Sequence, residues 1–188
     1  MKNLPLIIFC GLSGSGKSFN ARKLKQSLGG YDLIGPGILR ERLDIKTYSR
    51  KDTPMLLAKV IEQIENNHSK GVGSIVDANL KTVDIRQFFY DTAKGLGINV
   101  IVVETHCSSE AIRERMDGRV QITAAENPKD FSVHLEQKKL WQDTSLDLEL
   151  DSSITLLRKD TERNEIHQVR VDRSSEEIVG KIIEILKG

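Results

Sequence analysis

The chain has 188 residues and a formal net charge of +1, with 38% hydrophobic and 29% charged residues, an ordinary composition for a globular protein. Its length allows one domain with a substantial core and is too short for two domains of ordinary size. The balanced charge excludes a global electrostatic attraction to nucleic acids or membrane surfaces, so any basic patch has to be local.

Hydrophobic patterning predicts strands and helices that alternate along the chain. Strands are expected at 4–10, 31–34, 74–77, 99–104, 154–158 and 166–171, and helices at 17–28, 38–43, 54–69, 83–96, 108–116, 128–143 and from 174 onward. Alternation of this kind favours a parallel sheet covered by helices on both faces. We therefore expect a three-layer α/β fold with a mostly parallel, about five-stranded sheet. Without repeats or a linker, residues 1–188 are expected to form a single domain.

The segment Gly11-Leu12-Ser13-Gly14-Ser15-Gly16-Lys17-Ser18 matches the phosphate-binding loop pattern G-x-x-x-x-G-K-[ST] at every fixed position. It stands between a predicted strand and a predicted helix, which is the context that this motif requires. Glycine allows the backbone to approach a ligand closely, and the loop amides then converge on phosphate oxygens at the positive end of the helix. The residues expected to bind nucleotide phosphates are Gly11, Ser13, Gly14, Ser15, Gly16, Lys17 and Ser18.

Within this loop, Lys17 is expected to reach the β- and γ-phosphates, and the Ser18 hydroxyl is expected to bind Mg²⁺. A second oxygen ligand normally comes from a carboxylate at the end of a neighbouring strand. Asp77 closes the apolar run Ser74-Ile75-Val76 and suits that position. An alternative role for Asp77 is to cap the turn into the next helix.

Arginines near two predicted helices could contribute positive charge to the site. Arg113, Arg115 and Arg119 lie in or just after the helix at 108–116, and Arg40 and Arg42 follow the turn at 35–37. A mobile segment that carries arginines can close over a transferring phosphoryl group and neutralise its charge away from water. The alternative is a solvated helix in which Glu110 and Glu114 form ordinary ion pairs.

The remaining residues with potential chemistry show little pattern. The four histidines, His68, His106, His134 and His167, lack metal-like spacing and are interpreted as structural or surface residues. A functional role stays open for His106, which alone lies next to the end of a predicted strand at the expected active edge. Phe131 and Trp141 are expected to pack rather than to stack on a base.

No run approaches the ~20 apolar residues of a membrane span. The two cysteines, Cys10 and Cys107, show no disulfide or metal pattern, so a reducing cytoplasmic setting is expected.

Taken in order, several segments between residues 5 and 140 give the chain a family resemblance. Beside the glycine loop they are Leu39-Arg40 with Leu43, Tyr48-Ser49, Val76-Asp77-Ala78-Asn79, Arg86, Glu104, Ile112-Arg113-Glu114-Arg115-Met116, Arg119 and Asn127-Pro128-Lys129-Asp130-Phe131. With these segments the chain resembles small P-loop kinases related to polynucleotide, gluconate and zeta-toxin kinases. The resemblance implies a P-loop kinase fold and the use of ATP with Mg²⁺.

The resemblance also implies roles for particular residues. Arg40 would lie at the phosphoryl acceptor, Arg115 would contact substrate, and Arg119 would act on the phosphates from a lid segment at about 113–130. Lys17, Asp77 and Arg119 would then be the catalytic residues. Many family members carry an aspartate three residues before Arg40 that accepts the proton of the acceptor hydroxyl, but this chain has Gly37 there. Glu41, Asp44 and Glu104 are possible replacements. A second departure is Lys129 and Phe131 in place of small lid residues.

Three functions fit these observations. The first is a kinase that transfers the γ-phosphate of ATP to a hydroxyl of a small molecule or a nucleic-acid end, without forming a stable nucleic-acid complex. The second is a nucleotide-binding switch that hydrolyses ATP slowly and acts through a partner. The third is an ATP-binding protein that has lost catalysis, which Gly37 favours. A GTPase is not expected, because the guanine-binding pattern N-K-x-D is absent from the sequence.

Overall fold

The fold is described from a computed structural model, which covers residues 3–45, 49–117 and 131–188. Its six-stranded sheet has the order β2-β3-β1-β4-β5-β6. The strands are β1 (Leu6–Cys10), β2 (Tyr31–Ile34), β3 (Gly73–Asp77), β4 (Val100–His106), β5 (Thr155–Asp160) and β6 (Glu165–Arg170). The first five pair in parallel, and β6 pairs antiparallel with β5. The expected count of about five strands is thus corrected to six, because the β5–β6 hairpin adds an antiparallel edge strand.

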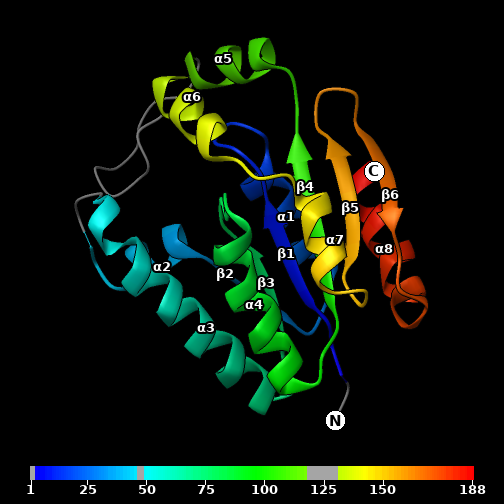
Figure 1. The fold of residues 1–188 in the computed structure, drawn as a ribbon. Coiled ribbons are helices and arrows are strands. Elements are labelled where there is room, and N and C mark those ends of the chain that lie inside the picture. Colours follow the sequence, from blue (N-terminus) through cyan, green and yellow to red (C-terminus); the bar gives the residue numbers. More distant parts are fainter. Residues whose placement is uncertain (1–2, 46–48, 118–130) are drawn as a thin grey trace.

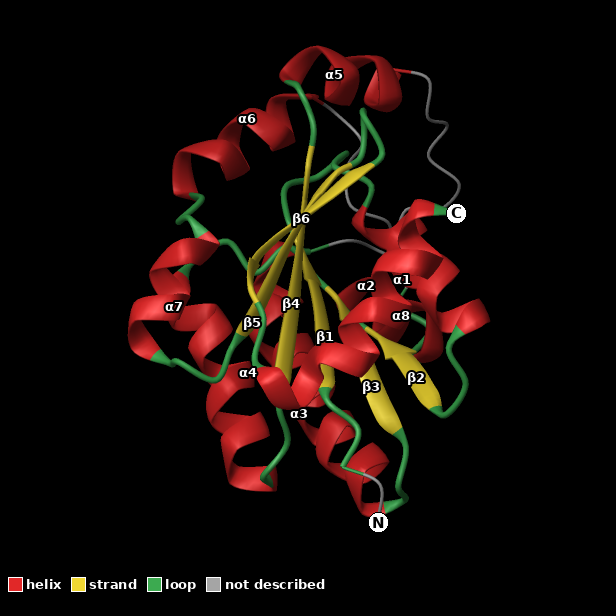
Figure 2. Cartoon of the chain, turned by 90° about the vertical axis from the view of Figure 1, so that its right-hand side faces the viewer, coloured by secondary structure: helices red, strands yellow, loops and turns green. Residues whose placement is uncertain are grey.

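Helices cover both faces of the sheet, which confirms the three-layer prediction (Figures 1 and 2). On one face lie α1 (Lys17–Ser27) and α8 (Glu176–Lys187); on the other lie α3 (Thr53–Ser69), α4 (Val83–Leu96) and the short α7 (Asp147–Leu150). The helix α2 (Pro36–Arg42) contacts α3. The described residues also form short 3₁₀ helices at η1 (Arg50–Asp52), η2 (Thr144–Leu146) and η3 (Arg173–Ser175).

The period of two along the central strands divides the apolar core between the two faces. In β1, Leu6 and Ile8 pack against the α3 and α4 side, whereas Ile7 and Phe9 pack against the α1 and α8 side. All four side chains are fully buried. A strand that is apolar on both faces is typical of the interior of a parallel sheet covered by helices.

The carboxyl ends of the parallel strands lie at one edge of the sheet, and two further helices stand above that edge (Figure 1). These are α5 (Ser109–Asp117) and α6 (Phe131–Leu140). The sequence predicts the second of them over 128–143, but the helix ends at Leu140, and 118–130 lie outside the described residues. Within the described ranges, every helix is too short or too polar to span a lipid bilayer.

Candidate functional site

The loop Gly11–Ser18, here called the P-loop, connects β1 to α1 at the carboxyl edge of the sheet. Gly11, Gly14 and Gly16 have φ angles of 138°, 86° and 91°, values that side chains disfavour. A Cβ on Gly11 would lie 2.3 Å from the carbonyl oxygen of Thr105, and one on Gly14 would lie 2.8 Å from Cγ2 of Ile112. The loop is therefore packed against β4 and α5 so closely that only glycine fits.

Polar contacts hold the P-loop in place. Lys17 is 7% exposed, and its ammonium donates a 2.9 Å hydrogen bond to the Leu12 carbonyl oxygen. The hydroxyls of Ser15 and Thr105 are 2.7 Å apart, and the Thr105 hydroxyl also donates to the carbonyl oxygen of Cys10. Ser18 lies half-buried in the first turn of α1. The ammonium of Lys17 thus lies against the loop backbone.

Asp77 ends β3 beside the P-loop strand, with Phe9 of β1 as its register partner. The Ala78 amide donates a 3.2 Å hydrogen bond to the Phe9 carbonyl oxygen, which joins the two strand ends. The Asp77 side chain is half-buried. Among the described residues, no group of three or more His, Cys, Asp and Glu side chains could enclose a metal ion. A hydroxyl and one carboxylate next to a phosphate-binding loop fit Mg²⁺, which keeps several waters and takes its other oxygens from phosphates.

Arg115 lies in α5 and is hydrogen-bonded to the hairpin between β5 and β6. Its guanidinium donates to the Thr161 hydroxyl at 2.8 Å, to the Thr161 carbonyl at 3.0 Å and to the Gly14 carbonyl at 3.5 Å. The Thr161 hydroxyl in turn donates to the Ser15 carbonyl at 2.9 Å. Thr161 therefore links three elements that are distant in sequence. Arg115 borders the P-loop, and its role as a substrate contact stays a prediction.

The other predicted arginines are placed differently. Arg40 is buried in α2 and donates a 3.4 Å hydrogen bond to the Ser49 carbonyl. Arg119 and most of the predicted lid segment lie outside the described residues. Arg86 is fully buried: it pairs with Asp147 and also donates to the Leu80 and Asp143 carbonyls. The arginine that the family resemblance places in this helix thus fastens α4 to the segment that follows α6.

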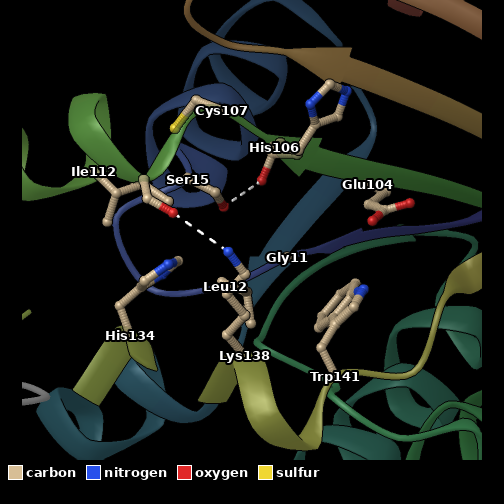
Figure 3. A pocket seen from close by; sticks show the side chains of 12 residues that line it. Gly11, Leu12, Ser15, Glu104, His106, Cys107, Ile112, His134, Lys138 and Trp141 are labelled. Atoms are coloured by element: carbon tan, nitrogen blue, oxygen red, sulfur yellow. Dashed lines mark hydrogen bonds between the residues drawn. The ribbon is translucent and has the colours of Figure 1, made fainter. Parts of the chain in front are cut away.

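A cavity of about 160 Å³ lies next to the P-loop, between β4, α5 and α6 (Figure 3). The loop side is formed by Gly11, Leu12 and Ser15, and the facing side includes His134 and Lys138 of α6 and Trp141 just beyond it. Glu104 lines the cavity too, whereas the other two possible bases, Glu41 and Asp44, are exposed at the end of α2. The candidate acid–base carboxylate nearest to the P-loop in this arrangement is thus Glu104.

The helix α6 supplies residues to the site that the sequence interpretation did not assign. Gln137 accepts a 2.9 Å hydrogen bond from the Ser13 amide of the P-loop. His134 is 2% exposed, and neither of its ring nitrogens has a hydrogen-bond partner among the described residues. Trp141 had been expected only to pack; it packs on the core and lies 5.8 Å from the Arg86 guanidinium, but it also lines the cavity. The available signal was the spacing: 134, 137, 138 and 141 follow i, i+3, i+4, i+7, which is one helical face.

Burial and charge within the cavity favour a neutral His134 imidazole and leave the positive charge of Lys138 without a paired carboxylate among the described residues. Burial lowers the pKa of His134 below its ordinary value of 6.5. The Glu104 carboxylate is held by the Arg158 guanidinium at 2.9 Å and by the Thr144 hydroxyl at 2.6 Å. Lys138 Nζ instead donates a 3.4 Å hydrogen bond to the neutral hydroxyl of Ser109, and no carboxylate of the described residues lies within salt-bridge distance of it.

A glycine loop with its lysine at the start of a helix, on a parallel sheet covered on both faces, defines a P-loop domain. A family model described as an AAA domain matches residues 6–144, and the chain belongs to that family. No curated protein gives a significant match.

Three solved structures share the fold over nearly the whole chain. A gluconokinase from Sinorhizobium meliloti 1021 is 18% identical, with a TM-score of 0.56 over 99% of this chain and 93% of that one. The APS kinase CysC of Mycobacterium tuberculosis in complex with AMPPNP and APS is 20% identical, with a TM-score of 0.57 over 99% of both chains. Chaetomium thermophilum Kti12 in complex with ADP-AlF3 is 21% identical, with a TM-score of 0.61 over 98% of this chain and 100% of that one. The fold predicted from the family resemblance, that of P-loop kinases, is thereby confirmed.

Proposed function

We propose that the protein is an ATP-dependent phosphotransferase, which moves the γ-phosphate of Mg-ATP to a hydroxyl of a small molecule or a nucleic-acid end. The observation that carries this proposal is the intact P-loop with its buried Lys17, set in a fold that kinases share. In phosphoryl transfer the protein acts almost entirely by positioning and by stabilising charge. The P-loop amides and Lys17 would hold the β- and γ-phosphates, and Ser18 and Asp77 would hold Mg²⁺ through oxygen ligands.

On the acceptor side, the proposal assigns roles to two arginines. Arg115 borders the loop at Gly14, which suits a cation close to substrate. Arg40 is buried in α2, and its role at the acceptor rests on the family resemblance alone.

The thiols of Cys10 and Cys107 are both free, which supports a reducing, cytoplasmic setting. We expect a stable complex neither with nucleic acid nor with a membrane.

A second candidate is an ATP-binding protein with little or no kinase activity, acting as a switch or a slow ATPase. Gly37 favours this candidate, because the position that carries an aspartate in many related kinases is an exposed glycine at the start of α2. A missing general base would cost about 10²-fold or more in rate. It would leave ATP binding intact.

The two candidates are separated by measuring ATP affinity and ADP release with a panel of hydroxyl compounds. A kinase releases ADP faster when its acceptor is added, and Lys17→Ala abolishes that stimulation. The matched control is Lys25→Ala, in the last turn of the same helix, which should behave as the wild type. Tight ATP binding without stimulation by any compound would favour the second candidate. Absence of ATP binding by the wild type would contradict both.

A further inference from the structure

The cavity between the P-loop and α6 combines four properties that point to a ligand. It adjoins Leu12, whose carbonyl holds the Lys17 ammonium. Its lining includes the buried His134 imidazole, whose two nitrogens have no hydrogen-bond partner among the described residues, Lys138, which has no ionic partner among them, and the indole of Trp141. Buried polar groups without partners are rare in folded proteins. An unsatisfied imidazole that lines a cavity therefore suggests a ligand that completes its hydrogen bonds.

We propose that this cavity binds the phosphoryl acceptor, that the acceptor is a small hydroxyl-bearing anion, and that His134 takes the proton of the reacting hydroxyl. This inference rests on the proposed phosphotransferase function and deepens it. It places the acceptor in this cavity, whose lining does not include Arg40, in place of the position near Arg40 that the family resemblance implies. In Figure 3 the side chains of His134, Lys138 and Trp141 rise from α6 and the residue after it toward Gly11 and Leu12 of the P-loop. The cavity therefore opens onto the loop that would carry the transferred phosphoryl group.

Size and charge define the class of acceptor. The volume of about 160 Å³ is below the roughly 300–1,000 Å³ of pockets that hold drug-sized ligands. A small acid fits this volume better than a nucleotide at a nucleic-acid end. The charge of Glu104 is offset by Arg158 at 2.9 Å, whereas Lys138 meets only the Ser109 hydroxyl. Because the remaining charge in the cavity is positive, a carboxylate or phosphate group on the acceptor would be favoured.

The chemistry requires a proton acceptor at the hydroxyl, and three observations favour His134 over the carboxylates. The imidazole is neutral near pH 7, because burial lowers its pKa. Its nitrogens have no partner among the described residues, whereas Glu104 Oε2 accepts from Thr144 and Arg158. Its ring is held in place by stacking on Phe131, with ring centroids 5.4 Å apart. With His134 as the proton acceptor, the reaction would not need a carboxylate at position 37, where this chain has glycine.

The reaction is an ordinary transfer of the γ-phosphoryl group from ATP to the acceptor hydroxyl. The acceptor oxygen forms a bond to the γ-phosphorus, and the bond from that phosphorus to the β–γ bridging oxygen breaks, so that ADP leaves. The hydroxyl proton passes to a ring nitrogen of His134 and then to solvent. Lys138 stays protonated throughout and serves to bind the anionic group.

Ligand binding can be tested apart from activity, because Trp141 is the only tryptophan of the chain and lines the cavity. Protein saturated with AMPPNP is titrated with D-gluconate and D-glycerate, and with the neutral polyols D-sorbitol and glycerol. Each acid and its polyol differ essentially in the carboxylate. We expect the acids to change the Trp141 fluorescence and to stimulate ADP release from ATP at least tenfold more effectively than the polyols or a 5′-hydroxyl oligonucleotide.

Two variants test the residues. Lys138→Met should raise KM for the acid at least tenfold and leave the Kd for ATP within twofold, whereas Lys139→Met, on the adjacent exposed position of α6, should match the wild type. His134→Asn should lower kcat about 10²-fold, with KM little changed and with loss of the acidic limb of the kcat profile. Thermal unfolding shows whether His134→Asn folds. If it does not, Lys138→Met still tests the inference, because Lys138 is exposed and its replacement should leave the fold intact.

The outcomes separate this inference from the proposed function. If ATP does not bind the wild type, the proposed function fails and the inference fails with it. If ATP binds but neither acid affects Trp141 or turnover, or the polyols act equally well, the anionic acceptor class is wrong and the proposed function stands. If an acid is phosphorylated while both variants keep wild-type KM and kcat, the acceptor lies elsewhere. A change in ATP affinity alone would assign the cavity to the nucleotide.

Discussion

The carboxylate of Asp147 accepts hydrogen bonds of 2.6 and 2.9 Å from the Arg86 guanidinium, and both side chains are buried. The Tyr90 hydroxyl donates to the same carboxylate at 2.6 Å. These bonds join α4 to α7 across the face of the sheet. They also fix the segment that carries Trp141, because the guanidinium lies 5.8 Å from the indole. One wall of the cavity is thus held by an ion pair that takes no part in ligand binding.

Asp147→Asn is expected to lower the free energy of unfolding by about 3–5 kcal/mol, because it leaves the buried Arg86 charge without a counter-charge. Urea denaturation followed by circular dichroism measures the change. The matched control is Asp91→Asn, an exposed carboxylate of α4, for which we expect a change within about 0.5 kcal/mol. Equal midpoints for the two variants would show that the buried pair contributes no net stability.

Alanine at two glycines should shift stability in opposite directions. Gly14→Ala places a Cβ 2.8 Å from Ile112 at a φ of +86°, so we expect a loss of about 1–3 kcal/mol. Gly180→Ala adds a methyl group in open space within α8, so we expect a gain of up to about 1 kcal/mol. Thermal or urea unfolding of both variants tests the pair. A Gly14→Ala protein as stable as the wild type would mean that the loop can relax away from α5.

Thr161→Val should loosen the P-loop, because it removes the hydroxyl that donates to the Ser15 carbonyl and accepts from Arg115. One hydrogen bond contributes about 1 kcal/mol, which corresponds to a roughly fivefold rise in the Kd for ATP. Calorimetric titration measures the affinity. Thr161→Ser retains the hydroxyl and should bind as the wild type does; similar weakening in both variants would indicate that the methyl group matters instead.

The folded protein should lose stability as the pH falls from 7 to 5, and His134 should account for part of this loss. Burial lowers the pKa of His134, so between this pKa and the ordinary value of 6.5 the unfolded chain binds more protons than the folded one. The positive charges of Lys138, on the same helix, and of Lys17, in the P-loop, lower the pKa further, whereas the Ser13 backbone acts against them. The other titratable groups that line the cavity are Glu104, His106 and Cys107. The free energy of unfolding therefore rises with pH through this window, and the contribution of His134 reaches its full value above about pH 6.5.

The midpoints of urea denaturation are compared at pH 5 and pH 7 for the wild type, His134→Asn and His167→Gln. His134→Asn should have a smaller pH dependence than the wild type. His167→Gln, which alters a histidine that is 64% exposed, should keep the wild-type dependence. An unchanged slope in His134→Asn would show that the imidazole takes up its proton without cost.

The sequence predicts the sheet and the P-loop well because both depend on local patterns. The apolar run before Gly11 and the β-branched residues after Asn99 are sufficient to place β1 and β4. The β5–β6 hairpin was also predicted as two strands, but its position at the sheet edge depends on pairing with β4, which no local pattern encodes. The sheet was therefore counted one strand short.

The cavity could not be predicted in the same way, because it requires α6 to return to the P-loop. The bond from the Ser13 amide to Gln137 spans 124 residues, and no composition or spacing signals a contact of that range. The helical spacing of His134 and Lys138 was visible, but it indicates a shared face without saying what the face meets. The proposed roles of Asp77, Arg40, Arg115 and Arg119 stay predictions.

The partners of the P-loop have a consequence for synthesis on the ribosome. The loop is synthesised before Thr105, Arg115, Gln137 and Thr161, which contact it and follow it by about 90 to 150 residues. Until the β5–β6 hairpin has left the exit tunnel, the nascent chain cannot assemble the loop as it stands in the finished protein. Contacts of such long range also form slowly once the chain is free. A premature stop before Thr161 should therefore yield chains that carry the complete motif in their sequence but not the finished site.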